Sequence, residues 1–196
     1  MPRFLVVGRV MLSRRGFAGI ALRYKSRVYC VDPGGLVEGC DYVICTHMHE
    51  RHCGQEIQGF PGDRIVSPST GVVKPGTSLT LGDLSIRVVD AYNIPEFYEN
   101  PPHPKGSGVG YVLEAGGTRV YFTGDTNLID DMVNIAGVEV LVVPIGGGSV
   151  MTPEEAFEAV KTIRPVIAIP THFDSASYYY KFRDLVQPYT QVVFLR

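Results

Sequence analysis

The sequence predicts an α/β protein in which two β-sheets form a sandwich flanked by helices. Three observations lead to this prediction. The first half of the chain contains short runs rich in Val, Ile, Leu and Tyr, bounded by Gly, Pro and Asp. The second half alternates apolar strand-like runs with helical patterns. With 196 residues, 45% hydrophobic and 19% charged, the chain can bury a substantial core as one domain, residues 1–196.

The expected strands of the first half and centre lie at 3–7, 19–24, 27–31, 42–45, 64–67, 78–81, 85–90, 110–114 and 119–123. A long irregular stretch from 93 to 108 interrupts them, and such loops are often lids or binding loops. Helices at 128–136, 153–163 and 177–186 then alternate with strands at 138–144, 166–170 and 191–195. The helix at 153 has the clearest start, because Thr152 can cap it, Pro153 suits its first turn and Glu155 completes a capping box.

Charge and hydropathy narrow the class of protein. The net charge of −2 provides no global positive field for a nucleic-acid backbone, so no nucleic-acid partner is expected. No apolar run approaches the roughly 18 residues of a membrane span. The N-terminal apolar patch is interrupted by Arg9 and lacks a small-residue cleavage site, so we expect no signal peptide and a cytoplasmic protein. The expected partner is a small-molecule substrate, and homo-oligomerisation is left open.

Four cysteines lie close together in the first third of the chain: Cys30, Cys40, Cys45 and Cys53. None forms a CxxC pair, so a zinc ribbon or thioredoxin-type motif is not supported. Cys30 and Cys45 occupy apolar runs and are predicted to be small buried hydrophobic residues. A metal contact by Cys53 is the minor alternative. A disulfide is left open for a hyperthermophilic source.

The strongest chemical signal is a cluster of histidines. Three of the five histidines, His47, His49 and His52, form THMHERH directly after the apolar run DYVIC. On a strand-to-helix turn these three positions can converge, and neutral imidazole is a good ligand for zinc and similar metals. A lone histidine would be read as a solvated surface group. Three within six residues after a buried strand instead predict a metal site.

Three further segments place metal-ligand residues beyond apolar runs or in the irregular loop. In VYFTGDT, Asp125 ends an apolar strand at a Gly turn, and His172 lies just beyond the run VIAIP. His103 lies in the irregular loop. Each signal is weak alone, since Gly-Asp turns are common for conformational reasons and a lone loop histidine is usually solvated.

Taken together, these segments resemble the metallo-β-lactamase superfamily, and most closely its small members similar to the ascorbate-6-phosphate lactonase-like branch. The resemblance covers nearly the whole chain. It rests on VDPG at 31–34, THxHxxH at 46–52, GDT at 124–126, PIGG at 144–147 and PTH at 170–172. It implies a four-layer αββα sandwich and a metal-dependent hydrolase.

The resemblance also implies ligand roles. The first metal would be held by His47, His49 and His103, and the second by His52 and His172, with Asp125 bridging the two. Asp125 and His52 are the predicted catalytic residues. Asn93 stands where some relatives carry the loop histidine, so it is the alternative to His103. Asp32 is predicted either to support the metal ligands or to bond nearby backbone N–H groups in its turn.

The chain departs from the family pattern HxHxDH at Arg51, which stands where a metal-binding aspartate is expected. A guanidinium cannot ligate a metal and would repel a cation nearby. Glu50 could substitute, although a neighbouring residue generally points elsewhere. Arg9 replaces a histidine that relatives tend to carry after the early glycine. Arg51 and Arg9 are therefore predicted to bind an anionic substrate, whereas Lys105 is expected to be a solvated surface charge.

The predicted function is hydrolysis of a small, anionic ester, lactone or phosphoester by a metal-activated hydroxide. Zinc is the expected ion, with manganese or iron as alternatives, and one ion is favoured over two. The alternative is a non-catalytic member of the same fold that binds a metal or anion and has lost the second metal through Arg51. A nuclease is disfavoured by the net charge.

Overall fold

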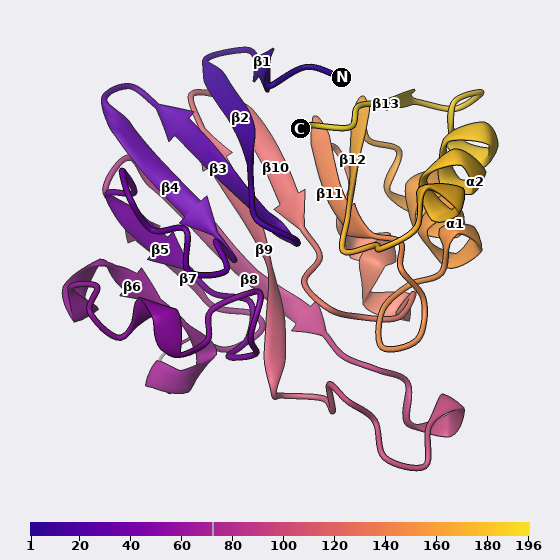
Figure 1. Ribbon diagram of the computed structural model, residues 1–196, viewed down its shortest axis with the longest axis horizontal. Helices are drawn as coiled ribbons and strands as arrows, with labels where there is room; N and C mark the ends of the chain where they lie inside the picture. Colours follow the sequence, from indigo (N-terminus) through magenta and orange to yellow (C-terminus); the bar gives the residue numbers. More distant parts are fainter. Residues whose placement is uncertain (72) are drawn as a thin grey trace.

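Two packed β-sheets form the body of the protein in the computed structural model, which describes residues 1–71 and 73–196 (Figure 1). Over these residues the first sheet has six strands in the order of the chain: β1 (Phe4–Val7), β2 (Val10–Arg15), β3 (Gly19–Tyr24), β4 (Arg27–Val31), β5 (Tyr42–Ile44) and β6 (Ile65–Val66). The second sheet has seven strands, in the order β13-β12-β11-β10-β9-β8-β7: β7 (Ser78–Leu81), β8 (Leu84–Ala91), β9 (Gly108–Ala115), β10 (Thr118–Phe122), β11 (Val140–Pro144), β12 (Ile167–Thr171) and β13 (Gln191–Val192).

Both sheets change from antiparallel to parallel pairing partway across. Strands β1 to β4 pair antiparallel and β4 to β6 parallel, while β7 to β10 pair antiparallel and β10 to β13 parallel. The loops that follow parallel strands leave a sheet at one edge, where α/β proteins commonly bind ligands. The carboxyl ends of β4, β5, β10 and β12 therefore supply the loops that carry the predicted site residues.

The main core lies between the two sheets. Strand β8 shows the pattern most clearly, because Leu84, Ile86 and Val88 are buried while the alternating Ser85 and Arg87 are exposed. A second core lies on the outer face of the second sheet, beneath helices α1 (Pro153–Ile163) and α2 (Ala176–Val186). Figure 1 shows both helices on this one side of the sandwich.

The start and end of α1 confirm the sequence prediction. The Thr152 hydroxyl accepts a hydrogen bond from the Glu155 N–H at 3.2 Å, and Glu155 Oε2 accepts from the Thr152 N–H at 2.8 Å. The predicted strands at 19–24, 27–31 and 78–81 are also confirmed with the same bounds. The predicted pair of β-sheets is confirmed as well.

The outer face of the first sheet is covered differently. Within the part of the chain that the structure describes, this layer contains the short 3₁₀ helices η1 (Gln55–Ile57) and η2 (Gly62–Arg64) in a loop-rich segment, in place of α-helices. Beneath it lie two small apolar clusters, around Val43 and Ile57 in one and Val28 in the other.

Two disulfides in this layer correct the prediction for the cysteines. Cys30 is bonded to Cys40, and Cys45 to Cys53. Cys30 and Cys45 are buried, as expected, but they are cystine halves rather than simple apolar residues, and the bonded Cys53 is not a thiolate ligand. The pairing depends on the parallel neighbours β4 and β5 and on the return of the loop after β5, which the spacing of the cysteines does not reveal.

Two further elements differ from the prediction. The expected helix at 128–136 is the 3₁₀ helix η5 (Asp130–Asn134), which begins after Ile129 without a side-chain cap. Strand β2 was not predicted, because its arginines obscure the alternation that buries Val10 and Leu12. Within residues 1–71 and 73–196, neither α-helix has the length and apolar character needed to cross a membrane.

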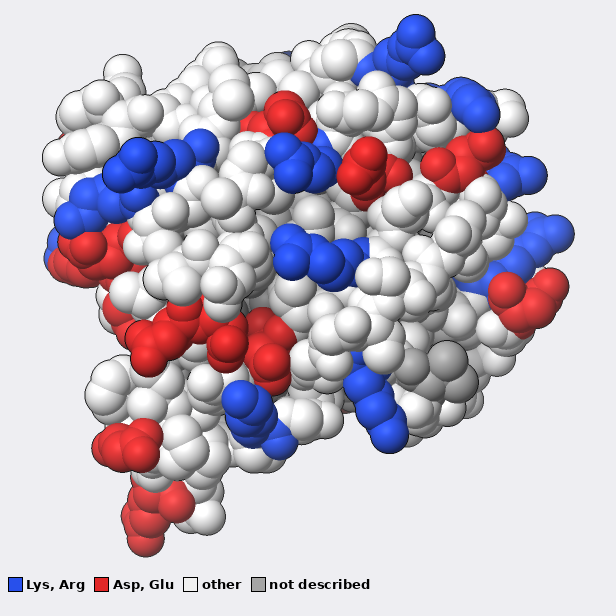
Figure 2. Space-filling view, turned by 180° about the vertical axis from the view of Figure 1, so that it is seen from behind, with Lys and Arg blue, Asp and Glu red and all other residues white. Residues whose placement is uncertain are grey.

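The irregular stretch between β8 and β9 is confirmed as a long loop containing the 3₁₀ helix η4 (Pro95–Phe97); a further 3₁₀ helix, η3 (Pro68–Thr70), follows β6. Figure 1 shows the η4 loop reaching away from the sheets, and Figure 2 shows acidic side chains at its far end, where Glu96 and Glu99 are exposed. Its return segment brings His103 back to the site.

Candidate metal centre

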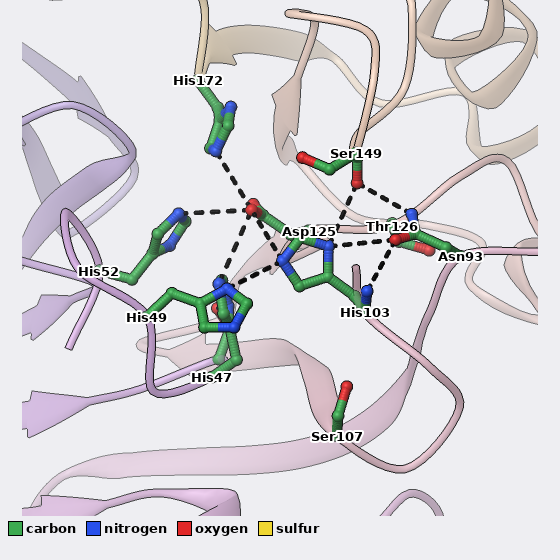
Figure 3. A network of polar contacts seen from close by, with 12 residues as sticks. His47, His49, His52, Asn93, His103, Ser107, Asp125, Thr126, Ser149 and His172 are labelled. Atoms are coloured by element: carbon green, nitrogen blue, oxygen red, sulfur yellow. Dashed lines mark hydrogen bonds and ion pairs between the residues drawn. The ribbon is translucent and has the colours of Figure 1, made fainter. Parts of the chain in front are cut away.

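The predicted ligands come together at the carboxyl ends of the parallel strands. His47, His49 and His52 follow β5, Asp125 follows β10 and His172 follows β12. Figure 3 shows the imidazoles arranged around the Asp125 carboxylate. Asp125 Oδ2 lies 3.7 Å from His47 Nε2, 3.4 Å from His52 Nε2, 3.6 Å from His103 Nε2 and 3.1 Å from His172 Nε2. His49 completes the group, because its Nδ1 lies 3.1 Å from His103 Nε2.

Unusual backbone conformations hold several of these residues in place. Asp32, Arg51 and His172 have φ values of 46°, 70° and 52°, in the left-handed region that only a few per cent of non-glycine residues adopt, Asn, Asp and His more often than the others. Gly124 has φ 69°, and a Cβ there would lie 2.7 Å from Val109 O. Strain of this kind persists at functional sites where the surrounding structure enforces it.

Asp32 supports the ligands through three hydrogen bonds. Its carboxylate accepts from the Thr46 N–H at 2.8 Å and from the Thr46 hydroxyl at 2.6 Å, and lies 3.0 Å from His52 Nδ1. The Thr46 hydroxyl, having donated to Asp32, accepts from His47 Nδ1 at 2.9 Å. Asp32 therefore bonds a backbone N–H, which is one of its two predicted roles, and it also contacts His52, one of the predicted ligands.

These contacts determine the tautomers of His47 and His52. Because Nδ1 of each ring carries the proton that is donated to Thr46 or Asp32, Nε2 of each neutral ring carries a free lone pair. Both Nε2 atoms are buried and have no hydrogen-bond partner among the described residues. An unsatisfied buried acceptor is costly, so two of them facing one carboxylate oxygen indicate a cation between them.

Of the two loop candidates, His103 is the one that points to the centre, with its Nε2 3.6 Å from Asp125 Oδ2. Asn93 Oδ1 accepts from the His103 N–H at 2.8 Å and lies 3.2 Å from its Nδ1, and Ser149 O lies 3.3 Å from the same nitrogen. With two acceptors at Nδ1, His103 presents an unprotonated Nε2 to the centre. Asn93 is fully buried behind His103 and supports it instead of replacing it.

The electrostatics keep these groups ready to bind a cation. Burial lowers the pKa of His47 to about 4, and burial also lowers the pKa of His103, so both rings are neutral near pH 7. Burial opposes a charge on His52, but the hydrogen bond and charge of Asp32 raise its pKa. Burial alone would raise the pKa of Asp125. The hydrogen bond with His172 and the neighbouring histidines instead hold it well below its usual range.

Among the described residues, donor atoms fall into three compact groups that share this centre. The donor atoms lie within 4.8 Å of one another in His47, His49 and His103, in His52, Asp125 and His172, and in Asp32, His47 and His52. Imidazole and carboxylate donors suit zinc, iron and manganese. The donor set, the two unpartnered Nε2 atoms and the anionic Asp125 therefore fit a metal ion.

Arg51 lies at the mouth of the site. Its guanidinium is centred 3.4 Å from the centre of the Phe17 ring and lies 3.4 Å from Asp174, and its side chain is 56% exposed. Phe17 in turn contacts His172 edge-on, with ring centres 4.7 Å apart. Arg51 and Glu50 both line the opening, whose cavity has a volume of about 180 Å³. Arg51 is thus beside the ligands without donating to them.

The structure corrects the role predicted for Arg9. Arg9 is exposed in the turn between β1 and β2, next to Gly8, whose Cα lies against Thr118 at the start of β10. Asp125 follows the opposite end of β10, so Arg9 is far from a ligand at the site. Lys105 is a solvated surface charge, as expected, 3.8 Å from Asp90 and 60% exposed.

Two residues of the site were not predicted. Thr46 links Asp32 to His47, and the only signal in the sequence is a hydroxyl residue between the apolar run and the first histidine. Phe17 lies in the hairpin between β2 and β3 and reaches the site only through the packing of that hairpin. Nothing in its local sequence identifies it.

Two packed sheets with a histidine–aspartate centre at the carboxyl ends of their strands define a protein of the metallo-β-lactamase fold. Residues 19–172 match the family described as the beta-lactamase superfamily domain. The chain belongs to this superfamily, and within it to the UPF0173 metal-dependent hydrolase family.

Individual relatives support this assignment. A protein of Opitutus terrae named as a UPF0173 metal-dependent hydrolase is 32% identical over 163 residues, which cover 74% of this chain and 71% of that protein. A crystal structure from Parabacteroides distasonis matches with a TM-score of 0.80 at 24% identity, covering 95% of this chain and 94% of that one. A metallo-β-lactamase fold protein from Bacillus subtilis matches with a TM-score of 0.71 at 15% identity, covering 92% and 89%. The two structures establish the shared fold.

Proposed function

We propose that this protein is a metal-dependent hydrolase of a small substrate with an ester, lactone or phosphoester bond. The observation that carries the proposal is the pair of buried Nε2 atoms, in His47 and His52, that have no partner among the described residues and face Asp125. The relatives' name, metal-dependent hydrolase, agrees with it. The similarity to the ascorbate-6-phosphate lactonase-like branch makes an anionic lactone one substrate to test.

Zinc is the ion that we propose, with manganese and iron as alternatives, because the donors are imidazoles and one carboxylate. His47, His49 and His103 would hold the tightly bound ion, with Asp125 beside it. His52 and His172 would serve a second, weaker position. We favour one tightly bound ion, because Arg51 replaces the expected aspartate and its charge acts on His52.

The bound ion would supply Lewis acidity, which polarises a carbonyl or phosphoryl oxygen and lowers the pKa of water. The chain's own groups then orient the reactants. Asp125, which stays ionised, can accept a hydrogen bond from the attacking water and so direct it. His52 is held by Asp32 so that its Nε2 faces the reacting centre. The cavity of about 180 Å³ suits a small substrate.

Arg51 gives the proposed preference for an anion. It is half exposed at the opening, and a guanidinium binds carboxylate or phosphate oxygens with two parallel hydrogen bonds. Asp174, 78% exposed, is its present partner at 3.4 Å and could be displaced by a substrate anion.

The test combines metal analysis with a substrate panel. Protein purified without chelators is analysed for zinc, manganese and iron, then assayed on a p-nitrophenyl ester, a lactone with and without a phosphate group, and a phosphodiester. We expect a bound metal and turnover of at least one class, with chelator and H47A each removing it. R51A should lower kcat/KM for anionic substrates more than for neutral ones, whereas R9A should match the wild type.

A second function is favoured by one observation, namely the arginine in place of a metal-binding aspartate. In that case the protein binds a metal or an anion without catalysis. A bound metal with no turnover of any substrate class would support this function over hydrolysis. Protein that neither contains nor binds a metal would contradict hydrolysis, and protein that also binds no phosphate or carboxylate anion would contradict both functions.

A further inference from the structure

Two disulfides border the two loops that carry the metal-binding machinery. The Cys45–Cys53 bond encloses residues 46–52, which include His47, His49 and His52. The Cys30–Cys40 bond encloses Asp32, the carboxylate that orients His52. Cys30, Cys45 and Cys53 are fully buried. Nothing in the proposed chemistry uses any of these sulfur atoms.

Little other packing holds this layer on the sheet. On the second sheet, α1 and α2 cover a large apolar core. On the first sheet, over the described residues, the cover is a loop with short 3₁₀ helices, and its apolar clusters are small. Both disulfides lie in these clusters, and Cys40 packs against both of them. The cystines therefore connect a thin outer layer to the strands in place of a helix.

The two ends of the histidine loop are anchored unequally. At the first end, the Cys45 N–H donates to Val66 O at 2.8 Å, and Cys45 O accepts from the Tyr111 hydroxyl at 2.8 Å. At the second end, the Cys53 N–H donates to His49 O, a bond within the loop itself. The next hydrogen bonds along the chain, in residues 54–60, run to near neighbours in sequence. The Gly34 N–H donates to His52 O at 2.7 Å, but Gly34 lies in the loop that Cys30–Cys40 closes and not in a strand.

We propose that the Cys45–Cys53 disulfide is a positioning element of the metal centre, which holds His47, His49 and His52 in the binding arrangement before the metal arrives. The inference rests on the proposed metal-dependent function. Without the bond, the second end of the loop would be held only by packing and by the contacts of His52 to Gly34 and Asp32, and metal binding would have to order it further, which weakens affinity. Cys45 and Cys53 thus act on the metal through the three histidines between them.

The Cys30–Cys40 bond provides a matched control. The two cystines have similar sequence separations, 10 and 8 residues, and each closes a loop on the same face of the same sheet. Asp32, however, stays anchored without Cys40, because the Asp32 N–H donates to Ile44 O and its carboxylate holds Thr46. Removing either bond should lower stability, but only the loss of Cys45–Cys53 should strongly change the metal centre.

The experiment compares wild type, C45A/C53A and C30A/C40A. Zinc affinity is measured by competition with a chromophoric chelator, the coordination geometry by the visible absorption of the Co²⁺-loaded proteins, and stability by thermal unfolding of the metal-free proteins. We expect C45A/C53A to bind zinc at least about tenfold more weakly, with a changed Co²⁺ spectrum. C30A/C40A should lose thermal stability while its zinc affinity and Co²⁺ spectrum stay near wild type.

A second measurement uses the wild type alone and does not depend on a variant that folds. Hydrogen exchange of residues 46–53 should be about equally slow with and without zinc, because the disulfide already orders the loop. A metal-free loop that exchanges as fast as an unfolded segment would overturn the proposal. So would free thiols in protein that is purified and denatured without reductant.

The remaining outcomes separate this inference from the function on which it rests. Wild type that binds neither zinc nor Co²⁺ would refute the proposed function. Wild type that binds zinc, with unchanged affinity in folded C45A/C53A, would refute only the positioning role. An equal loss of affinity in C45A/C53A and C30A/C40A would refute it too, because it would show a general effect of stability.

Discussion

Replacing Asp32 by Asn tests whether the carboxylate network organises the metal centre. Asp32 is 4% exposed and its carboxylate makes the three contacts to Thr46 and His52 at 2.6–3.0 Å. The amide has nearly the same shape, but it offers only one oxygen and no charge. The Thr46 hydroxyl and His52 Nδ1 both donate to Oδ2, whereas the Thr46 N–H donates to Oδ1, so the NH₂ group of the Asn would face either the first two donors or, at lower cost, the Thr46 N–H alone. We expect the Thr46 N–H to lose its partner and the bonds that orient the Thr46 hydroxyl and His52 to weaken.

The size of the effect follows from the contacts. A hydrogen bond to a charged group contributes about 1.5–3 kcal/mol and a neutral one about 0.5–1.5 kcal/mol. Weakening two of the three bonds by roughly 1 kcal/mol each, and losing the third, should lower the free energy of unfolding by about 3.5–5 kcal/mol. Residues that support metal ligands typically alter affinity about 10–100-fold, equivalent to about 1.4–2.8 kcal/mol. D32N should therefore bind zinc about 10–100-fold more weakly than the wild type.

The assay is zinc competition against a chromophoric chelator, with thermal unfolding of the metal-free protein in parallel. D41N is the matched control, because the Asp41 carboxylate accepts one hydrogen bond, from the Val28 N–H at 2.7 Å, on the same sheet. D41N should lose some stability and keep its zinc affinity. Folded D32N with a zinc affinity within about twofold of wild type, against the 10–100-fold expected, would refute the role assigned to Asp32.

The remaining predictions concern other parts of the centre. R51D should raise the zinc content per chain, measured by elemental analysis, because it removes a positive charge and adds a carboxylate; an unchanged metal content would show that Arg51 does not limit the second position. N93A should weaken zinc binding several-fold through His103, whereas N134A, at an exposed position, should not; equal affinities in the two variants would contradict this. G124A should lower the melting temperature more than G76A, because both glycines have positive φ but only the Cβ at Gly124 would meet backbone within 4 Å; equal losses would contradict the close approach.

Much of the fold follows from short-range patterns in the sequence. Apolar runs bounded by Gly and Pro locate β3, β4 and β7, and Thr152 with Glu155 locates the start of α1. These signals are local, since a strand or a cap needs only its own residues and their neighbours. The prediction failed where the local signal is mixed, as in β2 and η5. Pairing with β1 and β3 makes β2 a strand, and tertiary packing determines the conformation of η5.

The candidate site shows the same division. Histidines and an aspartate directly after buried strands predicted the ligand types, because strand ends meet at one edge of a sheet. The spacing within THMHERH did not reveal that Cys45 and Cys53 are bonded across it. The roles of Arg9 and Arg51 were likewise beyond local pattern, since both depend on where distant turns are placed.

The sequence by itself determined the class of fold, the kinds of ligand and the strand ends that present them. Only the tertiary structure decided which ring nitrogen of four of the histidines faces Asp125, that His103 and not Asn93 reaches the centre, and that Arg9 lies elsewhere. The physical reason is the range of the interactions. Strands and caps are specified by neighbouring residues. A metal centre is instead specified by contacts between segments as distant in the sequence as those of His52 and His172, which exist only once both sheets have packed.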